Sequence, residues 1–263
     1  MTLKTVLKAL TYEMWLPVLI VVALWVGSAR SENLFFPPLK VIANTFAQMW
    51  LFDRLGTDAW PSVRNVLIGL ALATMVGVLA GLLFGLVEGL YQAALPVLEF
   101  MRAVPGIVLV PVGLALLGIG DSMKIGVIAY GTLWPIMLHT IDGVRSIDLV
   151  VTDMAKSFHV KRFQLLWRVV LPSASPQILA GARISVSMGI VLIIASEYVA
   201  STRGIGFLQL QAERTFAIPE MWAALVLLGI IGYASNVIFR IVENRVLRWY
   251  IGLRNSGKEG ITA

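Results

Sequence analysis

The sequence predicts an all-α protein that crosses a membrane several times. Of its 263 residues, 58% are hydrophobic and only 14% are charged, whereas soluble domains carry about 25% charged residues. The apolar residues fall in long uninterrupted runs, and a spanning helix needs roughly 17–25 such residues. Membrane barrels are built instead from short segments of alternating polarity, so we expect a helical bundle.

Six apolar runs are long enough to cross a membrane, and charged or Pro/Gly-rich joints separate them. The expected spans lie at residues 10–29, 62–87, 97–118, 123–142, 177–200 and 219–241, in one transmembrane domain that covers residues 1–263. The first run has a second interpretation as a signal peptide, because Lys4 and Lys8 precede its apolar core and the segment GSAR follows it. Signal-peptide cores are usually about 7–15 residues long, and this longer core favours a retained anchor.

The basic residues predict the orientation of the chain, because cytoplasmic loops are enriched in Lys and Arg. With the N-terminus inside, twelve basic residues are cytoplasmic: Lys4, Lys8, Arg145, Lys156, Lys161, Arg162, Arg168, Arg240, Arg245, Arg248, Arg254 and Lys258. Seven lie outside: Arg30, Lys40, Arg54, Arg64, Lys124, Arg203 and Arg214. The sequence therefore predicts that both termini are cytoplasmic. Basic residues clustered between apolar runs are typical of lipid-headgroup contacts rather than of nucleic-acid binding.

The longest expected outer loop covers residues 30–61. Its segment FFPPLKVIANTFAQMWLF places two prolines before apolar residues at helical spacing. These apolar residues are Val41, Ile42, Phe46 and Met49. We expect a short helix that lies at the outer membrane surface.

A basic segment at residues 148–172 interrupts the apolar runs between the fourth and fifth expected spans. Before Pro172 it contains neither Pro nor Gly, and two short apolar stripes follow each other with charge on the opposite side. His159 lies near their junction, and His is enriched at positive φ. We expect two short amphipathic helices joined by a turn, with Pro172 and Pro176 ending the helix before the fifth span. The exposed apolar stripe indicates a docking surface; a loop that binds lipid headgroups is the alternative.

The same segment resembles the cytoplasmic signature of ABC importer permeases, which reads E-A-A, three residues, G, nine residues, I-x-L-P. The matching residues are Asp153, Met154, Ala155, His159, Val169, Leu171 and Pro172. The spacing agrees at every position, while Asp153, Met154 and His159 replace Glu, Ala and Gly. The segments SVRNVLIGLALATMVGVLAGLLFGL, RAVPGIVLVPVGLALLGIGDSMK and SEYVASTRGIGFLQLQA also resemble permeases of the nitrate/sulfonate/taurine type, so that the resemblance covers residues 36–248.

This resemblance implies a type I ABC importer permease core in a bacterial inner membrane, carrying a small anion such as a sulfonate, taurine or nitrate. The implied partners are a second copy of the chain, two cytoplasmic ABC ATPase subunits and an external solute-binding protein. ATP and Mg²⁺ would be bound by the ATPase, so this chain is expected to hold no cofactor and to be no enzyme. The residues implied to contact the ATPase are Asp153, Met154, Ala155, Lys156, Phe158, His159, Lys161, Leu171 and Pro172.

Charged and helix-breaking residues within the expected spans are candidates for the translocation path, because they are costly in lipid. The candidates are Arg102, Pro105, Ser196, Glu197 and Arg203. Arg102 follows Glu99 at a helical spacing that allows an ion pair, and the alternative for it is a pair at the cytoplasmic membrane surface. For Glu197 the alternative is a helix-packing contact. The second span also carries small residues at regular spacing, which permit close packing and suit a dimer seam: Gly69, Gly77, Gly81 and Gly85.

Two other function classes fit the sequence less well. An ion-coupled secondary transporter acting without an ATPase is the main alternative, and it predicts two related halves with paired broken helices, which the sequence does not display. An intramembrane enzyme is disfavoured because His139 and His159 fall in different compartments. The segment GLRNSGKE at residues 252–259 resembles a phosphate-binding loop, but Glu259 stands where Ser or Thr is needed.

Overall fold

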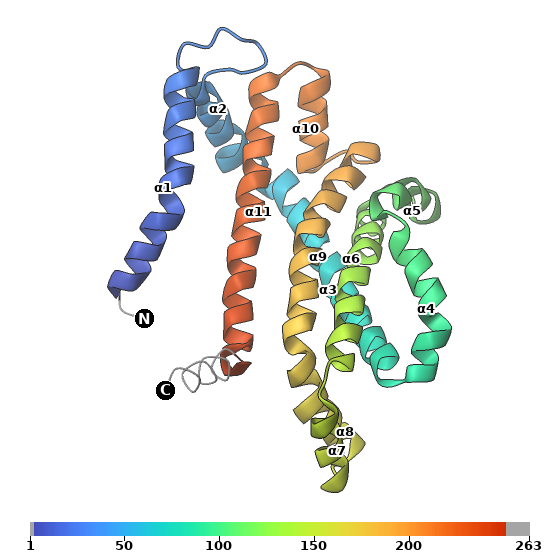
Figure 1. The fold of residues 1–263 in the computed structure, drawn as a ribbon. Coiled ribbons are helices and arrows are strands. Elements are labelled where there is room, and N and C mark those ends of the chain that lie inside the picture. The colour runs from blue at the N-terminus through green and yellow to red at the C-terminus, as the bar shows by residue number, and fades with distance from the viewer. Residues whose placement is uncertain (1–2, 251–263) are drawn as a thin grey trace.

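The structure is a computed structural model that describes residues 3–250, apart from the side chains of residues 3–14 and of Pro17, Asp53, Leu149, Thr152 and Lys156. Every regular element in this range is a helix, which confirms the all-α prediction. The long helices run along the long axis of the molecule in alternating directions (Figure 1). They are α1 (Leu3–Ser28), α3 (Trp60–Leu86), α4 (Glu88–Ala103), α6 (Asp121–Arg145), α9 (Leu171–Val199) and α11 (Ile218–Val246).

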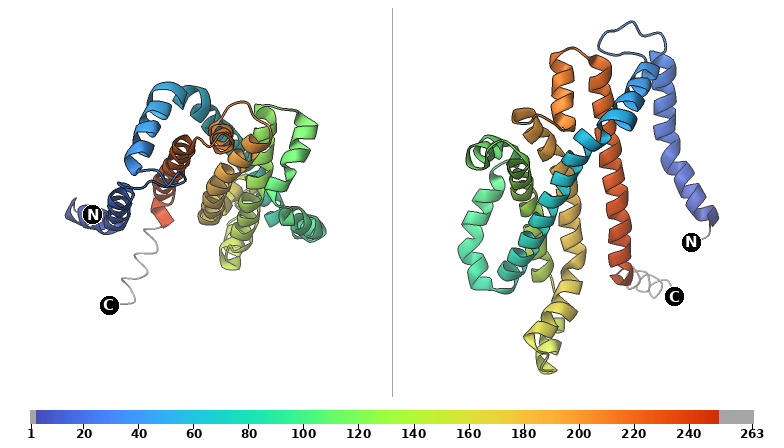
Figure 2. Two further views of the ribbon diagram at one scale, coloured as in Figure 1. Left: turned by 90° about the horizontal axis from the view of Figure 1, so that it is seen from above. Right: turned by 180° about the vertical axis from the view of Figure 1, so that it is seen from behind.

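Shorter elements gather at the two ends of the bundle (Figures 1 and 2). At one end, named here the α10 end, lie α2 (Leu39–Phe46), the π-helix η1 (Ala47–Ala59), the 3₁₀-helix η2 (Gly106–Leu109), α5 (Val110–Leu117) and α10 (Ile205–Arg214). At the opposite end, named the α7 end, lie α7 (Leu149–Ser157), α8 (Arg162–Leu165) and the π-helix η3 (Leu166–Val170). α1 begins and α11 finishes toward the α7 end (Figure 1).

Helix α6 is the centre of the bundle, because it contacts both α3 and α9 along its length. The glycines of α3 make this possible: a Cβ on Gly69 would come within 2.6 Å of the Ile128 side chain, a distance that real contacts do not allow. Gly69, Gly77, Gly81 and Gly85 face Ile128, Ile136, Thr140 and Val144 in that order. The prediction of close packing is confirmed, but the partner is α6 of the same chain, so the expected dimer seam at these glycines is wrong.

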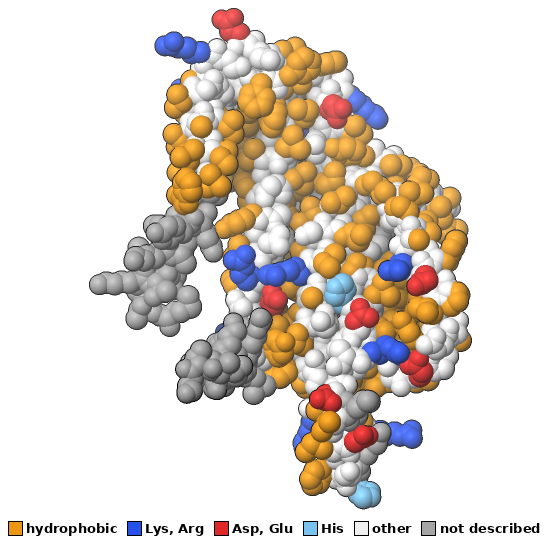
Figure 3. Space-filling model, in the orientation of Figure 1, with side chains coloured by type: hydrophobic (Ala, Val, Ile, Leu, Met, Phe, Trp, Pro, Cys, Tyr) orange, Lys and Arg blue, Asp and Glu red, His pale blue; other side chains and the backbone are white. Residues whose placement is uncertain are grey.

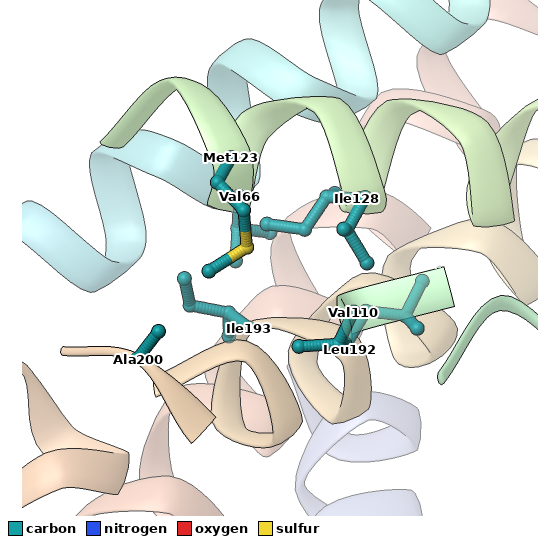
Figure 4. Close-up of a cluster of buried hydrophobic side chains, with 8 residues drawn as sticks. Val66, Val110, Met123, Ile128, Leu192, Ile193 and Ala200 are labelled. Atoms are coloured by element: carbon teal, nitrogen blue, oxygen red, sulfur yellow. The ribbon is translucent and has the colours of Figure 1, made fainter. Parts of the chain in front are cut away.

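Near the α10 end, a hydrophobic cluster locks α3, α5, α6 and α9 together (Figure 4). Its buried members are Val66, Val110, Met123, Val127, Ile128, Leu192, Ile193 and Ala200. Close packing of this kind makes the helices move as a unit, so the functional groups that they carry keep fixed relative positions.

Three described helices are long and apolar enough to cross a membrane, at Arg54–Leu86, Arg162–Val199 and Ile218–Val246. A fourth span results if the bent pair Glu88–Ala103 and Gly106–Leu117 is counted as one. α6 does not meet this criterion. It lies between α3 and α9, so less of its surface would face lipid and fewer of its residues need to be apolar. The count of six spans therefore stays a prediction.

The third expected span, at residues 97–118, is not one continuous helix. α4 begins at Glu88 and ends at Ala103, and the two halves of the pair differ in direction by 81°. Pro105 forces the preceding Val104 into an extended conformation, with ψ 113°. The segment GIGDSMK then reverses the chain in a tight turn, with positive φ at Gly118 and Gly120.

The prolines before the fifth span do not end the helix there, which corrects the prediction. One helix runs from Arg162 to Val199. Pro172 lies at the junction of η3 and α9, and Pro176 lies inside α9, so both prolines are within the continuous helix. The π-helix η3 immediately before them widens the backbone, a feature that accommodates an interrupted hydrogen-bond ladder.

The outer loop contains the expected short helix as α2, and it contacts α11. The chain then continues through η1 into α3. Trp50 in η1 is fully buried, and its Nε1 donates a hydrogen bond to the carbonyl of Ala223 over 3.2 Å. The phosphate-loop-like segment at 252–259 lies outside the described residues.

Candidate functional site

Helices α7 and α8 form a tip that projects beyond the rest of the bundle (Figures 1 and 2). The tip exposes large apolar side chains that a single chain leaves uncovered: Val150, Met154, Phe158, Phe163 and Trp167. Phe158 is 77% exposed. Lys161 and Arg162 are exposed beside them. Exposed apolar surfaces of this kind, rimmed by polar groups, are typical of sites where another protein binds.

The turn between α7 and α8 is centred on His159, as the sequence predicts. His159 has φ 52°, a left-handed conformation that costs a non-glycine residue roughly 1–2 kcal/mol. The amide of Val160 donates to the carbonyl of Ala155 over 3.0 Å, the bond that ends a helix after a left-handed residue. His159 therefore occupies the position at which the signature carries Gly, and it adopts the conformation that Gly would adopt.

The other residues implied to contact the ATPase divide into an exposed and a buried group. Asp153, Met154, Phe158, His159 and Lys161 are exposed on the tip. Ala155 is buried, Leu171 and Pro172 are half-buried, and the side chain of Lys156 lies outside the described ones. Leu171 packs with Leu82, Val144, Val170 and Ala174, which fixes the base of the tip to α3, α6 and α9.

A second feature is a groove of about 590 Å³ at the break between α4 and η2. It contains two of the expected path residues, Arg102 and Pro105, and is walled by one face of α6 and by Ile184 and Met188 of α9. Its other polar side chains are Glu99, Trp134, His139 and Asp142. Among these, the sequence singled out Glu99 and His139. It did not indicate Trp134 and Asp142, which the helical repeat of α6 places on the same face.

Arg102 and Glu99 form the expected ion pair, with 4.0 Å between Nη2 and Oε1, and both side chains are more than half exposed. Arg102 lies in the last turn of α4. The neighbouring Met101 carbonyl accepts a hydrogen bond from Tyr130 Oη, in the middle of α6, over 3.2 Å. The pair therefore lies at mid-depth in the bundle and not at one end of it.

Charged side chains gather on the same face as this groove. Figure 3 shows Lys, Arg, Asp, Glu and His between hydrophobic surfaces over α4, α6, α9 and α11. Two ion pairs join neighbouring helices of the bundle. Arg183 Nη2 of α9 lies 3.0 Å from Glu243 Oε2 of α11, and Arg145 of α6 pairs with Glu88 of α4. Ionised groups are excluded from lipid contact by their desolvation cost, so this face is directed toward water or protein.

A third feature is a buried polar cluster at the α10 end, built around Glu197, which is 1% exposed. Its Oε1 accepts a hydrogen bond from Ser62 Oγ at 2.6 Å, and its Oε2 accepts one from the Gly206 amide at 2.8 Å. Lys124 Nζ lies 3.8 Å from Oε1 and donates to Ser201 Oγ over 2.7 Å. One carboxylate thus joins α3, α6, α9 and the start of α10.

The other two expected residues at this end are differently placed. Ser196 is fully buried and donates to the Leu192 carbonyl one turn back (2.7 Å). Arg203 is exposed and pairs with Asp121 over 3.0 Å, and Arg64 binds the same carboxylate. Ser62 and Lys124 could not be assigned to this cluster from the sequence, because their contacts join segments far apart in the chain. Within residues 3–250, no group of three or more His, Asp and Glu side chains is arranged to hold a metal ion.

Comparison with known proteins gives the family. Residues 73–250 match the family described as binding-protein-dependent transport system inner membrane component. The chain is 30% identical over 225 residues to the taurine transport system permease protein TauC of Escherichia coli, which covers 82% of this chain and 81% of that protein. It is 28% identical over 237 residues to the nitrate import permease protein NrtB of Synechocystis, covering 87% and 86%.

The fold is also found in solved structures. A chain of the MetNI methionine ABC transporter, in an inward-facing conformation, superimposes with a TM-score of 0.64 at 18% identity, covering 71% of this chain and 93% of that one. At this identity the likeness shows the fold alone: that of a type I ABC importer permease.

Proposed function

The chain belongs to the family of inner membrane components of binding-protein-dependent transport systems, and from this premise we propose how its three features divide the work of import. It is the membrane-spanning permease subunit of an ABC importer. In the proposal, the α7–α8 tip docks on a separate ATPase and the groove at the α4 break lines the path of the solute. The Glu197 cluster keeps α3, α6, α9 and α10 together at the outer end of that path. The observation that carries the proposal is the exposed apolar and basic tip on the same helix as that cluster.

The continuous helix from Arg162 to Val199 supplies the mechanical connection. Its 38 residues correspond to a length of about 57 Å at 1.5 Å per residue. One end belongs to the tip and the other carries Glu197, which is bonded to α3 and α10. A rigid helix transmits a displacement from one end to the other. Closure of the ATPase on the tip would therefore displace the helices at the outer end of the path.

The groove supports the second part of the proposal because it places polar side chains at mid-depth. Its backbone is broken at Val104 and Pro105, and irregular backbone at membrane depth is tolerated where it lines a cavity or is buried in protein. A single chain leaves the groove open on the charged face, so we propose that a second copy of the chain covers that face. The solute would pass between the two copies.

The solute class follows from the relatives. TauC and NrtB are named as permeases for taurine and for nitrate, both of which carry a delocalised negative charge on oxygen atoms. We propose that this chain carries a small solute with an oxyanion group, delivered by an external binding protein on the α10 side, with the α7 end and both chain termini in the cytoplasm of a bacterium.

Reconstitution tests the proposed energy source. Vesicles that contain this chain with its ATPase and binding protein are expected to accumulate solute against a gradient only when ATP is present. Vesicles that contain the chain alone are expected to accumulate none under a proton or sodium gradient. Uphill uptake by the chain alone, measured with radiolabelled taurine and nitrate, would establish the rival ion-coupled secondary transporter and refute the proposal.

Orientation is tested by single-cysteine labelling, for which the chain is well suited because it contains no cysteine of its own. Lys161→Cys, on the exposed tip, is expected to stay unlabelled in intact cells by a maleimide that does not cross membranes, and to react after the cells are opened. Arg30→Cys, before α2, is the matched control and is expected to react in intact cells. The reverse pattern would place the tip outside and remove its ATPase role.

A further inference from the structure

The polar side chains of the groove are not scattered but sorted along its length. Gly106 lies against Gly131, since a Cβ on Gly106 would approach the Gly131 Cα to 3.2 Å. α4 and α6 run in opposite directions, so each residue earlier in α4 matches one later in α6. Leu98, one turn before Arg102 in α4, packs with Met137 and Ile141 of α6, so Arg102 lies near the level of Trp134 and Pro135. Glu99 lies lower, nearer to Leu138.

The upper level of the groove, toward the α10 end, offers hydrogen-bond donors. Arg102 presents its guanidinium group, which has no acceptor atoms. Trp134 Nε1 is buried and has no hydrogen-bond partner among the described residues, although an indole N–H in such a position normally finds one. These two donors suit the oxygen atoms of a sulfonate, carboxylate or nitrate group.

The lower level of the groove, toward the α7 end, offers acceptors. His139 Nδ1 lies 2.8 Å from the Pro135 carbonyl, which can only accept, so Nδ1 carries a proton and Nε2 is the ring nitrogen that can act as an acceptor. Asp142 lies one turn further along the same face and adds a carboxylate. His139 and Asp142 are about 6 and 10 Å along the α6 axis from Pro135, at 1.5 Å per residue.

The charges of the groove distinguish between classes of solute. Its charged side chains are Arg102, Glu99 and Asp142, one positive against two negative. A solute that carries only negative charge meets an unfavourable balance, and part of the attraction of Arg102 is already taken by Glu99 at 4.0 Å. A solute with an anionic group at one end and an ammonium group at the other meets a donor level and an acceptor level in the matching order.

From this arrangement we infer that the groove is a binding site for a small zwitterion, in which an oxyanion contacts Arg102 and Trp134 and an ammonium group contacts His139 and Asp142. The inference rests on the proposed function and narrows its solute class: an amino-sulfonate or an amino acid of similar length fits, and an inorganic anion does not. The groove thus contributes selectivity of its own, in addition to that of the external binding protein.

Direct binding to the permease separates this selectivity from that of the binding protein. The full chain, assembled with its ATPase in nanodiscs without binding protein, is titrated with four probes: taurine, β-alanine, ethanesulfonate and nitrate. We expect taurine or β-alanine to bind on the order of tenfold more tightly than ethanesulfonate or nitrate, because the latter lack the ammonium group that bonds to a carboxylate.

Three variants assign the effect to the groove. Asp142→Asn is expected to weaken binding of the zwitterion on the order of tenfold. It should not weaken binding of ethanesulfonate, because the change removes a repulsive charge, while Arg102→Gln weakens both. Glu220→Gln, which removes a carboxylate in the first turn of α11 and away from the groove, is the control and is expected to change neither. Each variant is first shown to assemble with the ATPase, so that loss of folding is not mistaken for loss of binding.

Equal or tighter binding of ethanesulfonate or nitrate would overturn the inference, as would a zwitterion preference that Asp142→Asn leaves intact, or binding of no probe. Uptake by the complete complex is measured in parallel. If ATP-driven uptake persists in any of these cases, the proposed function stands and only the zwitterion site is lost; if uptake fails with all probes and partners, the proposed function itself fails.

Discussion

Replacing Phe158 with glutamate is expected to release the ATPase from the permease while the permease itself stays folded. The side chain is 77% exposed at the tip of α7, so its loss leaves no cavity in the chain. Exposed aromatic residues that fill a pocket of a partner contribute about 2–4 kcal/mol to such interfaces, and a buried unpaired carboxylate adds to the cost. Affinity for the ATPase should therefore fall by at least about thirtyfold, with solute-stimulated ATP hydrolysis lost in proportion.

The measurement is co-purification of the ATPase with the permease, followed by titration of the separated subunits. Phe52→Glu is the matched control, because Phe52 is 82% exposed but lies in η1 at the α10 end of the molecule. It should leave ATPase association unchanged. Full association and full stimulated hydrolysis by the Phe158→Glu complex would show that the tip is not the docking surface.

Replacing Glu197 with leucine is expected to cause the largest loss of stability. The change removes the carboxylate that pairs with buried Lys124. It also leaves the Gly206 amide without its acceptor, and Ser62 keeps only the Asp58 carbonyl at 3.2 Å. Breaking a buried pair by removing one partner costs about 3–5 kcal/mol. The thermal unfolding midpoint of the purified chain, followed by tryptophan fluorescence, should fall on the order of 10 °C.

A second substitution distinguishes the cost of leaving Lys124 unpaired from the cost of changing the packing at position 197. Adding Lys124→Met to Glu197→Leu removes the unpaired cation, so the double variant should be more stable than Glu197→Leu alone. Glu213→Leu, an exposed position on α10, is the control and should change stability by less than about 0.5 kcal/mol. If the two cluster substitutions simply add, Lys124 and Glu197 are not coupled and the cluster does not hold the outer end.

The cluster also explains why two glycines follow Arg203. Gly204 has φ 124°, and a Cβ there would overlap the Glu197 carboxylate, while its amide donates to Asp58 Oδ1 over 3.0 Å. The backbone must approach the buried carboxylate closely at this turn, and only glycine allows it. Gly204 in the segment STRGIGF is therefore required by a tertiary contact with Glu197, which no local sequence pattern reveals.

The sequence alone determined the helical class, the apolar runs, the turn at His159 and the tip that follows α6. These depend on interactions within a few residues: hydrophobic periodicity, the excess of charge in one segment, and the conformations that His and Pro accept. The same local reasoning identified Pro105 as helix-breaking, and the span is broken there. It failed at Pro172, where the helix continues, because the effect of a proline depends on whether its surroundings satisfy the freed backbone groups.

Only the tertiary structure decided which polar residues act together. Two groups of side chains are separated by tens of residues along the chain and meet only because antiparallel helices pack together. The first is Glu197 with Lys124. The second is Arg102 with Trp134, His139 and Asp142. The α3 glycines, expected at a dimer seam, face α6 for the same reason. Spacing within a helix specifies which face a residue occupies, but the neighbour on that face is set by how whole helices pack, and that information is spread over all of them.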